Sequence, residues 1–231
     1  MQNHFIIGVD EVGRGCLLGD VVVCACILPH DVLTILDEKN TPSHQALTQA
    51  DDVGLIASHP LSALTDSKKL SEKKREMLFP LIQVYAIDFA IAKIPPAKID
   101  EINILQATLL GMRQAIEQVI LVINKKFANA TFTVVIDGNQ LPKLGDLAIF
   151  SQIQNLRAIV KGDGRHVSIS SASVLAKVSR DNDMKTLAKI YPNYAIEKHK
   201  GYGTVAHLQA IENFGVLAEH RKSFAPIKNL S

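Results

Sequence analysis

Two patterns of hydrophobic residues divide the chain into predicted strands and helices. Short runs rich in β-branched side chains predict strands, whereas apolar residues that recur every three or four positions predict helices. The predicted strands cover residues 5–11, 21–28, 85–94, 131–136 and 157–160. Helical periodicity begins at Ser71, continues over 99–116 and returns over 171–190. Strands interspersed with helices predict an α/β fold with a mixed sheet.

The polar stretches between these elements predict turns and loops. A short glycine-bearing turn separates the first two strands, which favours an antiparallel hairpin. Residues 30–64 follow Pro29, contain Pro42 and Pro60, and show weak periodicity, so we interpret them as a loop with short helical pieces. The part from 37 to 64 is the best candidate for an insertion, and residues 144–157 form a second long loop.

Length and composition limit the class of protein. At 231 residues, 47% of them hydrophobic, the chain is long enough for a sizeable core, and we expect a single domain over residues 1–231. The net charge of +2 means that nucleic-acid binding would depend on local clusters such as Lys73-Lys74-Arg75. The three cysteines cannot all pair, and neither a signal peptide nor an apolar run of roughly 20 residues is visible. We therefore expect a reduced, cytoplasmic protein that does not enter a membrane.

Acidic residues close several of the predicted strands. Asp10 and Glu11 end the first strand, Asp137 follows the fourth, and Asp163 follows the fifth. These carboxylates are hard oxygen ligands with no cysteine or histidine among them, a set that suits Mg²⁺ or Mn²⁺. Two such ions about 4 Å apart promote phosphoryl displacement without a histidine base. The pattern therefore predicts phosphodiester hydrolysis at one polar edge of the sheet.

Each acid also has a plain structural interpretation. Asp137 and Asp163 are both followed by glycine, and Asp-Gly is a frequent turn pair. Adjacent side chains on a regular strand point to opposite faces. Asp10 and Glu11 therefore share a site only if the strand ends or distorts there.

Six short motifs occur in a fixed order between about residue 5 and residue 228. They are Asp10-Glu11-Val12-Gly13-Arg14-Gly15, Asp66-Ser67-Lys68-Lys69-Leu70-Ser71, Ile136-Asp137-Gly138-Asn139, Lys161-Gly162-Asp163, Leu175-Ala176-Lys177-Val178-Ser179-Arg180-Asp181 and His199-Lys200-Gly201-Tyr202. Each motif alone carries little information, but the ordered set resembles bacterial ribonuclease HII.

This resemblance implies a ribonuclease H-like fold, with a central mixed five-stranded sheet flanked by helices and a helical C-terminal portion from about residue 190. It implies a metal-dependent endoribonuclease that hydrolyses RNA in RNA/DNA hybrids and incises 5′ to ribonucleotides embedded in duplex DNA. The products would carry 3′-hydroxyl and 5′-phosphate ends. By the same resemblance Asp10, Glu11, Asp137 and Asp163 would hold Mn²⁺ or Mg²⁺ in a two-ion mechanism, and the protein would be a monomer.

A glycine-flanked turn is the predicted reader of the ribose. The backbone of Gly13, Arg14 and Gly15 can approach a 2′-hydroxyl without obstruction by a Cβ, and Arg14 adds a phosphate donor. The resemblance adds Tyr202, which would pack on the deoxyribose that follows the ribonucleotide and so test the RNA-to-DNA junction.

Three basic residues are candidates for phosphate contacts. Lys68 lies in the second motif, and Lys177 and Arg180 share one polar helical stripe with Ser170 and Ser173. The stripe is alternatively an exposed helix face with Arg180 in a local ion pair. His199 either steadies phosphate or assists product release, or has a structural role.

One departure from the family pattern and two competing functions stay open. Cys16 replaces the proline that the family usually has after the turn, which leaves the turn less rigid.

A DNA-specific metal nuclease of the same fold would use the same acids but has no use for Tyr202. A non-catalytic hybrid-binding module would use the acids only to stabilise turns and would tolerate a chelator.

Overall fold

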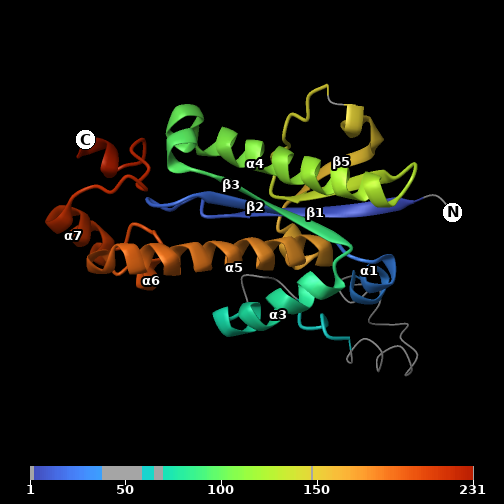
Figure 1. Cartoon of the computed structure of the whole chain (residues 1–231), viewed down its shortest axis with the longest axis horizontal. Helices are drawn as coiled ribbons and strands as arrows, with labels where there is room; N and C mark the ends of the chain where they lie inside the picture. The colour runs from blue at the N-terminus through green and yellow to red at the C-terminus, as the bar shows by residue number, and fades with distance from the viewer. Residues whose placement is uncertain (1–2, 38–58, 65–69, 147, 231) are drawn as a thin grey trace.

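A five-stranded sheet forms the centre of the computed structural model, which describes residues 3–37, 59–64, 70–146 and 148–230 (Figure 1). The strands are β1 (His4–Val12), β2 (Val21–Ile27), β3 (Asp88–Ile94), β4 (Thr131–Asp137) and β5 (Ile153–Ile159). They lie in the order β3-β2-β1-β4-β5. β1 pairs antiparallel with β2 and parallel with β4. Both the predicted hairpin and the predicted α/β fold with a mixed sheet are therefore confirmed.

Helices cover both faces of this sheet. Figure 1 shows α4 (Pro96–Lys126) along one face, and α5 (Val167–Ile190) along the other, with α3 (Glu72–Tyr85) and α1 (His30–Asp37) beyond it. Alternate residues of β1 enter different cores, because Ile7 and Val9 pack toward α4 whereas Ile6 and Val12 pack toward α5. This alternation also decides which face each acid at the end of β1 takes.

Several predicted elements have different ends in the structure. β3 begins at Asp88 instead of residue 85, because α3 continues to Tyr85, and β5 begins at Ile153 instead of residue 157. β5 is an edge strand with exposed Gln154 and Asn155, so it lacks the continuous apolar run of a buried strand. The predicted loop over 144–157 is accordingly shorter, since the 3₁₀ helix η3 (Ala148–Gln152) leads directly into β5.

The helices also extend beyond the periodic segments. α4 spans 31 residues with a kink at Asn103, where φ is 66°, and α5 begins at Val167 instead of residue 171. α1 is one of the helical pieces predicted in the 30–64 stretch. Most of the predicted insertion, residues 38–58, lies outside the described residues.

After α5 the described chain forms short helices. These are η5 (Pro192–Tyr194), α6 (Ile196–His199), α7 (Val205–Phe214) and η6 (Ile227–Asn229). They pack on Leu17 and Leu18 through a separate apolar cluster, and Leu18 pairs with His220 in an isolated bridge. The turn that follows β1 is therefore joined to the C-terminal helices.

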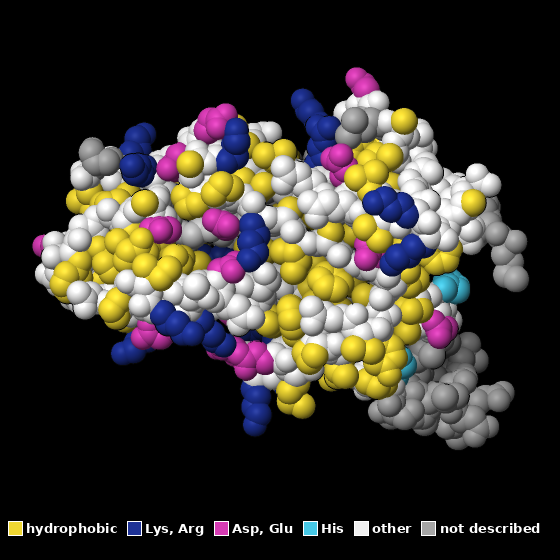
Figure 2. Space-filling view, in the orientation of Figure 1, with side chains coloured by type: hydrophobic (Ala, Val, Ile, Leu, Met, Phe, Trp, Pro, Cys, Tyr) yellow, Lys and Arg dark blue, Asp and Glu magenta, His cyan; other side chains and the backbone are white. Residues whose placement is uncertain are grey.

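The surface carries no large region of one charge on the face shown in Figure 2, where basic and acidic side chains are interspersed. The three cysteines are buried free thiols. None of the described helices has the length and apolar character that crossing a membrane requires.

Candidate active site

Asp10 and Asp137 lie side by side at the ends of two parallel strands. β1 and β4 are paired up to Val9 and Ile136, so the next residue of each strand is an aspartate at the same edge. Because Val9 and Ile136 point into the core beneath α4, Asp10 and Asp137 take the face toward α5. Sheet geometry thus brings together two acids that are far apart in the sequence.

Gly8 allows α5 to lie directly on β1. A Cβ at this position would meet the helix backbone at 2.2 Å, so a larger residue would force the helix away. The 3₁₀ turn just before α5, η4 (Gly162–Gly164), carries Asp163. The Gly162 N–H donates to Asp137 Oδ1 at 2.7 Å and ties this turn to β4. Close packing of the helix therefore brings the third acid to the same edge.

The three aspartates converge closely enough to share an ion. One carboxylate oxygen from each of Asp10, Asp137 and Asp163 lies within 4.8 Å of the other two. Burial, and then the charge of Glu11, raises the pKa of Asp10 to about 7, although Lys177 acts in the opposite direction. Like charges held this close in a buried site require compensation.

Glu11 approaches the same edge from the opposite face of β1. The pairing of β1 with β2 keeps a regular register through Val12, so the strand ends just beyond Glu11 without distortion. Glu11 Oε1 accepts from Arg14 at 3.3 Å, whereas Glu11 Oε2 is buried and has no hydrogen-bond partner among the described residues. Burial raises the pKa of Glu11, and Arg14 limits that rise. Asp10 and Glu11 nevertheless line one hollow, because they lie at the edge where the two faces meet.

The donor set at this edge fits a divalent metal ion. All four side chains offer carboxylate oxygens, the ligand type that Mg²⁺ and Mn²⁺ prefer. A buried oxygen without a partner on Glu11, and three converging aspartates beside it, are the features that a bound cation would satisfy.

The turn after β1 and Tyr202 line the same hollow, which has a volume of about 260 Å³. Gly13 has a φ of 90°, and a Cβ there would meet Arg180 Nε at 2.3 Å, so only glycine fits. A Cβ built on Gly15 would lie 4.0 Å from the Tyr202 ring, which is consistent with close contact between turn and ring. Tyr202 is 49% exposed. An accessible backbone turn, an aromatic ring and the acids therefore face one space.

The basic candidates differ in their surroundings. Lys177 lines the hollow, and its ammonium group donates to Ser173 Oγ. Ser173 of α5 also has a side-chain hydrogen bond with Asp10, a role that its place in the predicted polar stripe does not reveal. Lys68 lies outside the described residues.

Arg180 is placed for a task other than the predicted phosphate contact. Its side chain is 2% exposed, and its guanidinium donates to the carbonyls of Leu18, Asp20 and Lys200 at 2.8–3.2 Å. The stripe is not an exposed helix face either, because Ser170 and Ser173 are buried. Arg180 joins the turn after β1 to the segment that carries Tyr202.

Sequence reasoning missed Arg221, a second buried arginine in this region. It donates to the carbonyl of Gly19 at 2.8 and 3.0 Å and to that of Arg14 at 2.9 Å. Burial lowers the pKa of Arg221 to about 10. In the sequence it appears only as half of the basic pair Arg221-Lys222, which is typical of a solvated surface.

Comparison with known proteins agrees with this architecture. The family model described as Ribonuclease HII matches residues 7–48 and 58–226. The chain belongs to the ribonuclease HII family. Ribonuclease HII of Psychrobacter arcticus is 47% identical over 234 residues, which cover 96% of this chain and 76% of that protein.

Two solved structures share the fold of this chain. The PCNA:RNase HII complex from Archaeoglobus fulgidus matches with a TM-score of 0.60 and 18% identity, over 94% of this chain and 93% of the other. Bst-RNase HIII in complex with Mn²⁺ matches with a TM-score of 0.64 and 16% identity, over 99% and 70% of the two chains. The predicted ribonuclease H-like fold is confirmed.

Membership of the family makes this chain a metal-dependent hydrolase, an endoribonuclease that acts on RNA/DNA hybrids. The interpretation as a non-catalytic binding module is therefore set aside.

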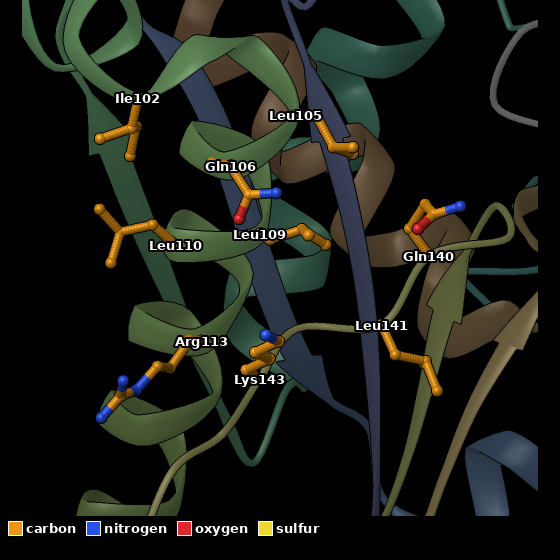
Figure 3. Close-up of a pocket in the computed structure, with 9 residues that line it drawn as sticks. All are labelled: Ile102, Leu105, Gln106, Leu109, Leu110, Arg113, Gln140, Leu141 and Lys143. Carbon is orange, nitrogen blue, oxygen red and sulfur yellow. The ribbon is translucent and has the colours of Figure 1, made fainter.

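A larger hollow of about 540 Å³ lies near the acids (Figure 3). Leu109 and Arg113 of α4 line one side, and Gln140 and Lys143 from the segment after β4 line the other. Its lining contains no carboxylate and offers no hard charged ligand for a metal. The converging acids, and not the larger hollow, are therefore the candidate metal centre.

Proposed function

We propose that this ribonuclease HII incises duplex DNA on the 5′ side of an embedded ribonucleotide, leaving 3′-hydroxyl and 5′-phosphate ends. The observation that carries the proposal is the meeting of Tyr202 and the Gly13–Gly15 turn beside Asp10 and Asp137 in one hollow. A nuclease that ignored the sugar would need the acids but would have no use for a bare backbone turn and an exposed ring beside them.

The turn is suited to recognise the ribose. A 2′-hydroxyl both donates and accepts hydrogen bonds, and it is the group that distinguishes RNA from DNA. Gly13, Arg14 and Gly15 line the hollow, and Gly15 would leave room for the sugar, because a Cβ there would meet nothing nearer than the Tyr202 ring at 4.0 Å. Tyr202, half exposed on the other side, would pack on the following sugar and favour deoxyribose, because a 2′-hydroxyl would crowd its ring.

The acids are the proposed metal ligands. Asp10, Asp137 and Asp163 would hold Mn²⁺ or Mg²⁺ from the α5 side, and Glu11 would contribute its unpartnered Oε2 from the α4 side. When bound in pairs, such ions supply water activation and charge stabilisation for in-line phosphoryl displacement. The Gly162 N–H fixes the Asp137 carboxylate, and the turn and Tyr202 orient the scissile phosphate toward this edge.

Two cationic side chains would contact the phosphates next to the cleaved bond. Arg14 is exposed at the rim of the hollow, and Lys177 lines it beside Asp10. Lys68 stays a prediction of the same kind. Because every proposed group belongs to one chain, we also propose that the protein works as a monomer. Its duplex DNA substrate further favours a cytoplasmic location.

The direct test is an incision assay with an end-labelled DNA duplex that contains one ribonucleotide. The protein is incubated with Mn²⁺ or Mg²⁺, and an all-DNA duplex and a chelator-treated sample serve as controls. We expect a single metal-dependent cut immediately 5′ to the ribonucleotide and none in the all-DNA duplex. Cutting of both duplexes would instead favour a DNA-specific metal nuclease.

A further inference from the structure

Three buried histidines from separate elements lie together behind the Tyr202 segment. They are His199 at the end of α6, His207 in α7, and His220 in the segment after α7. The His199 and His207 rings stack with centroids 4.1 Å apart and planes 16° apart. The His207 and His220 rings follow at 5.2 Å and 28°.

The partners of these rings fix where each proton lies. His199 Nδ1 accepts from the Gly201 N–H, and His220 Nδ1 accepts from the Leu217 N–H. Because a neutral imidazole donates from its other nitrogen, His220 Nε2 donates to His207 Nε2 at 3.1 Å. His207 must then carry its proton on Nδ1, which donates to the Tyr202 carbonyl at 2.9 Å.

The three rings are therefore neutral and their bonding is complete. His199 Nε2 donates to the Tyr194 carbonyl at 2.9 Å, so all six ring nitrogens have a partner. An added proton on any ring would place two donors face to face. Burial lowers the pKa of His207 and lowers that of His220 to about 4, in agreement with this arrangement.

Two of these bonds hold the backbone around Tyr202. His199 Nδ1 holds the Gly201 N–H, and His207 Nδ1 holds the Tyr202 carbonyl. The Tyr202 hydroxyl has a hydrogen bond with the Cys16 thiol, and the rest of the ring is half exposed at the hollow. The backbone position from which the ring projects is held by the two histidines, together with the Thr204 N–H, which donates to the Tyr202 carbonyl at 2.8 Å.

We propose that His199, His207 and His220 are positioning residues that hold Tyr202 at the place where the RNA-to-DNA junction is read. His199 and His207 act through their Nδ1 atoms, and His220 acts by fixing the tautomer of His207. This inference rests on the proposed function, because it assigns a purpose to the position of Tyr202.

The matched substitutions are asparagine and glutamine at the same position. The asparagine amide lies where Nδ1 of histidine lies, whereas the glutamine amide reaches the place of Nε2. His207→Asn and His199→Asn therefore keep the bond to the Tyr202 segment, and His207→Gln and His199→Gln lose it. A packing role alone predicts the reverse order, because glutamine is closer to histidine in volume and leaves the smaller cavity.

The readout is junction preference, the ratio of kcat/KM on a duplex with one ribonucleotide to that on a uniform RNA/DNA hybrid. We expect this ratio to fall by about tenfold in both glutamine variants and by less than about threefold in both asparagine variants, since one buried hydrogen bond separates them. The exposed His4, whose ring bonds Thr131 and Thr133 at the far end of β1, supplies the control variant His4→Gln. If one variant fails to fold, the pair at the other position decides.

Tyr202→Ala in the same assay separates the inference from the function on which it rests. If Tyr202→Ala lowers the ratio and the glutamine variants do not, the histidine network has no positioning role. If Tyr202→Ala leaves the ratio unchanged, the proposed reading of the junction by Tyr202 is itself wrong. Equal ratios in the asparagine and glutamine variants would also overturn the inference.

Discussion

The acids at the sheet edge and the histidines behind Tyr202 are two polar clusters that differ in charge and in hydrogen bonding. Asp10, Asp137 and Asp163 bring like charges within 4.8 Å, beside a Glu11 oxygen without a partner. In the histidine cluster every ring nitrogen has a partner. A cluster of like charges attracts a cation, whereas a cluster with complete hydrogen bonding holds a neighbour in place. The comparison indicates that a metal-binding site needs uncompensated negative charge, whereas a group that positions a neighbour needs complete hydrogen bonding.

Asp137→Asn should produce the largest effect. It removes a ligand charge at nearly constant volume, and the amide oxygen can still accept from the Gly162 N–H. We expect cleavage to fall by at least about 10³-fold, because metal-assisted stabilisation contributes several kcal/mol. Single-turnover cleavage and fluorescence binding of the one-ribonucleotide duplex measure the two consequences.

The thermal unfolding midpoint of Asp137→Asn tests whether the acids repel one another when no metal is bound. Without metal, loss of one like charge should leave the midpoint unchanged or raise it. A marked fall in the midpoint, or cleavage at the wild-type rate, would contradict the assignment of Asp137 to a metal-binding cluster of like charges.

Arg221→Lys tests the connection between the two clusters. Its three hydrogen bonds to the Arg14 and Gly19 carbonyls need the planar guanidinium, which one ammonium group cannot reproduce. We expect the free energy of unfolding to fall by about 2–3 kcal/mol in chemical denaturation. Arg113→Lys, which only removes a guanidinium 5.8 Å from the Phe150 ring, is the control and should cost less than about 1 kcal/mol. Equal losses in the two variants would show that burial of Arg221 contributes nothing specific.

The two clusters should respond to pH with opposite signs. The pKa of Asp10 is raised from 3.8 to about 7, so its contribution to stability is present at low pH and is lost as pH rises through 7. The pKa of His220 is lowered from 6.5 to about 4, so its contribution is present above 6.5 and is lost as pH falls through 4.

Thermal unfolding at a series of pH values, with a chelator present, measures how stability changes with pH. We expect these changes to be smaller than the effects of Asp137→Asn and Arg221→Lys. Between pH 4 and 6.5 the two slopes oppose each other, so stability should rise more steeply with pH in Asp10→Asn and should fall with rising pH in His220→Asn. Wild-type slopes in both variants would mean that other groups govern the pH dependence.

The sequence predicted the acidic edge of the sheet better than it predicted the surroundings of Tyr202. Strand-end acids leave a visible pattern, because hydrophobic runs stop at Asp10 and Asp137 and the parallel pairing follows from the fold. The roles of Arg180 and Arg221 cannot be predicted from such a pattern. Both side chains bind backbone carbonyls, and every residue has a carbonyl whatever its side chain. The sequence also predicts the start of the edge strand β5 at residue 157 instead of Ile153, because exposed polar residues interrupt the apolar pattern at the start of the strand.

The length of α5 has a consequence for how this chain tolerates change. Ser173, near Asp10, and Arg180, which holds the carbonyls of Leu18 and Lys200, lie two helical turns apart on one continuous helix. One inserted residue between them would rotate Arg180 by about 100° and shift it by about 1.5 Å, out of reach of those carbonyls. Related chains should therefore vary in length in their loops, while the spacing from Ser173 to Arg180 stays invariant.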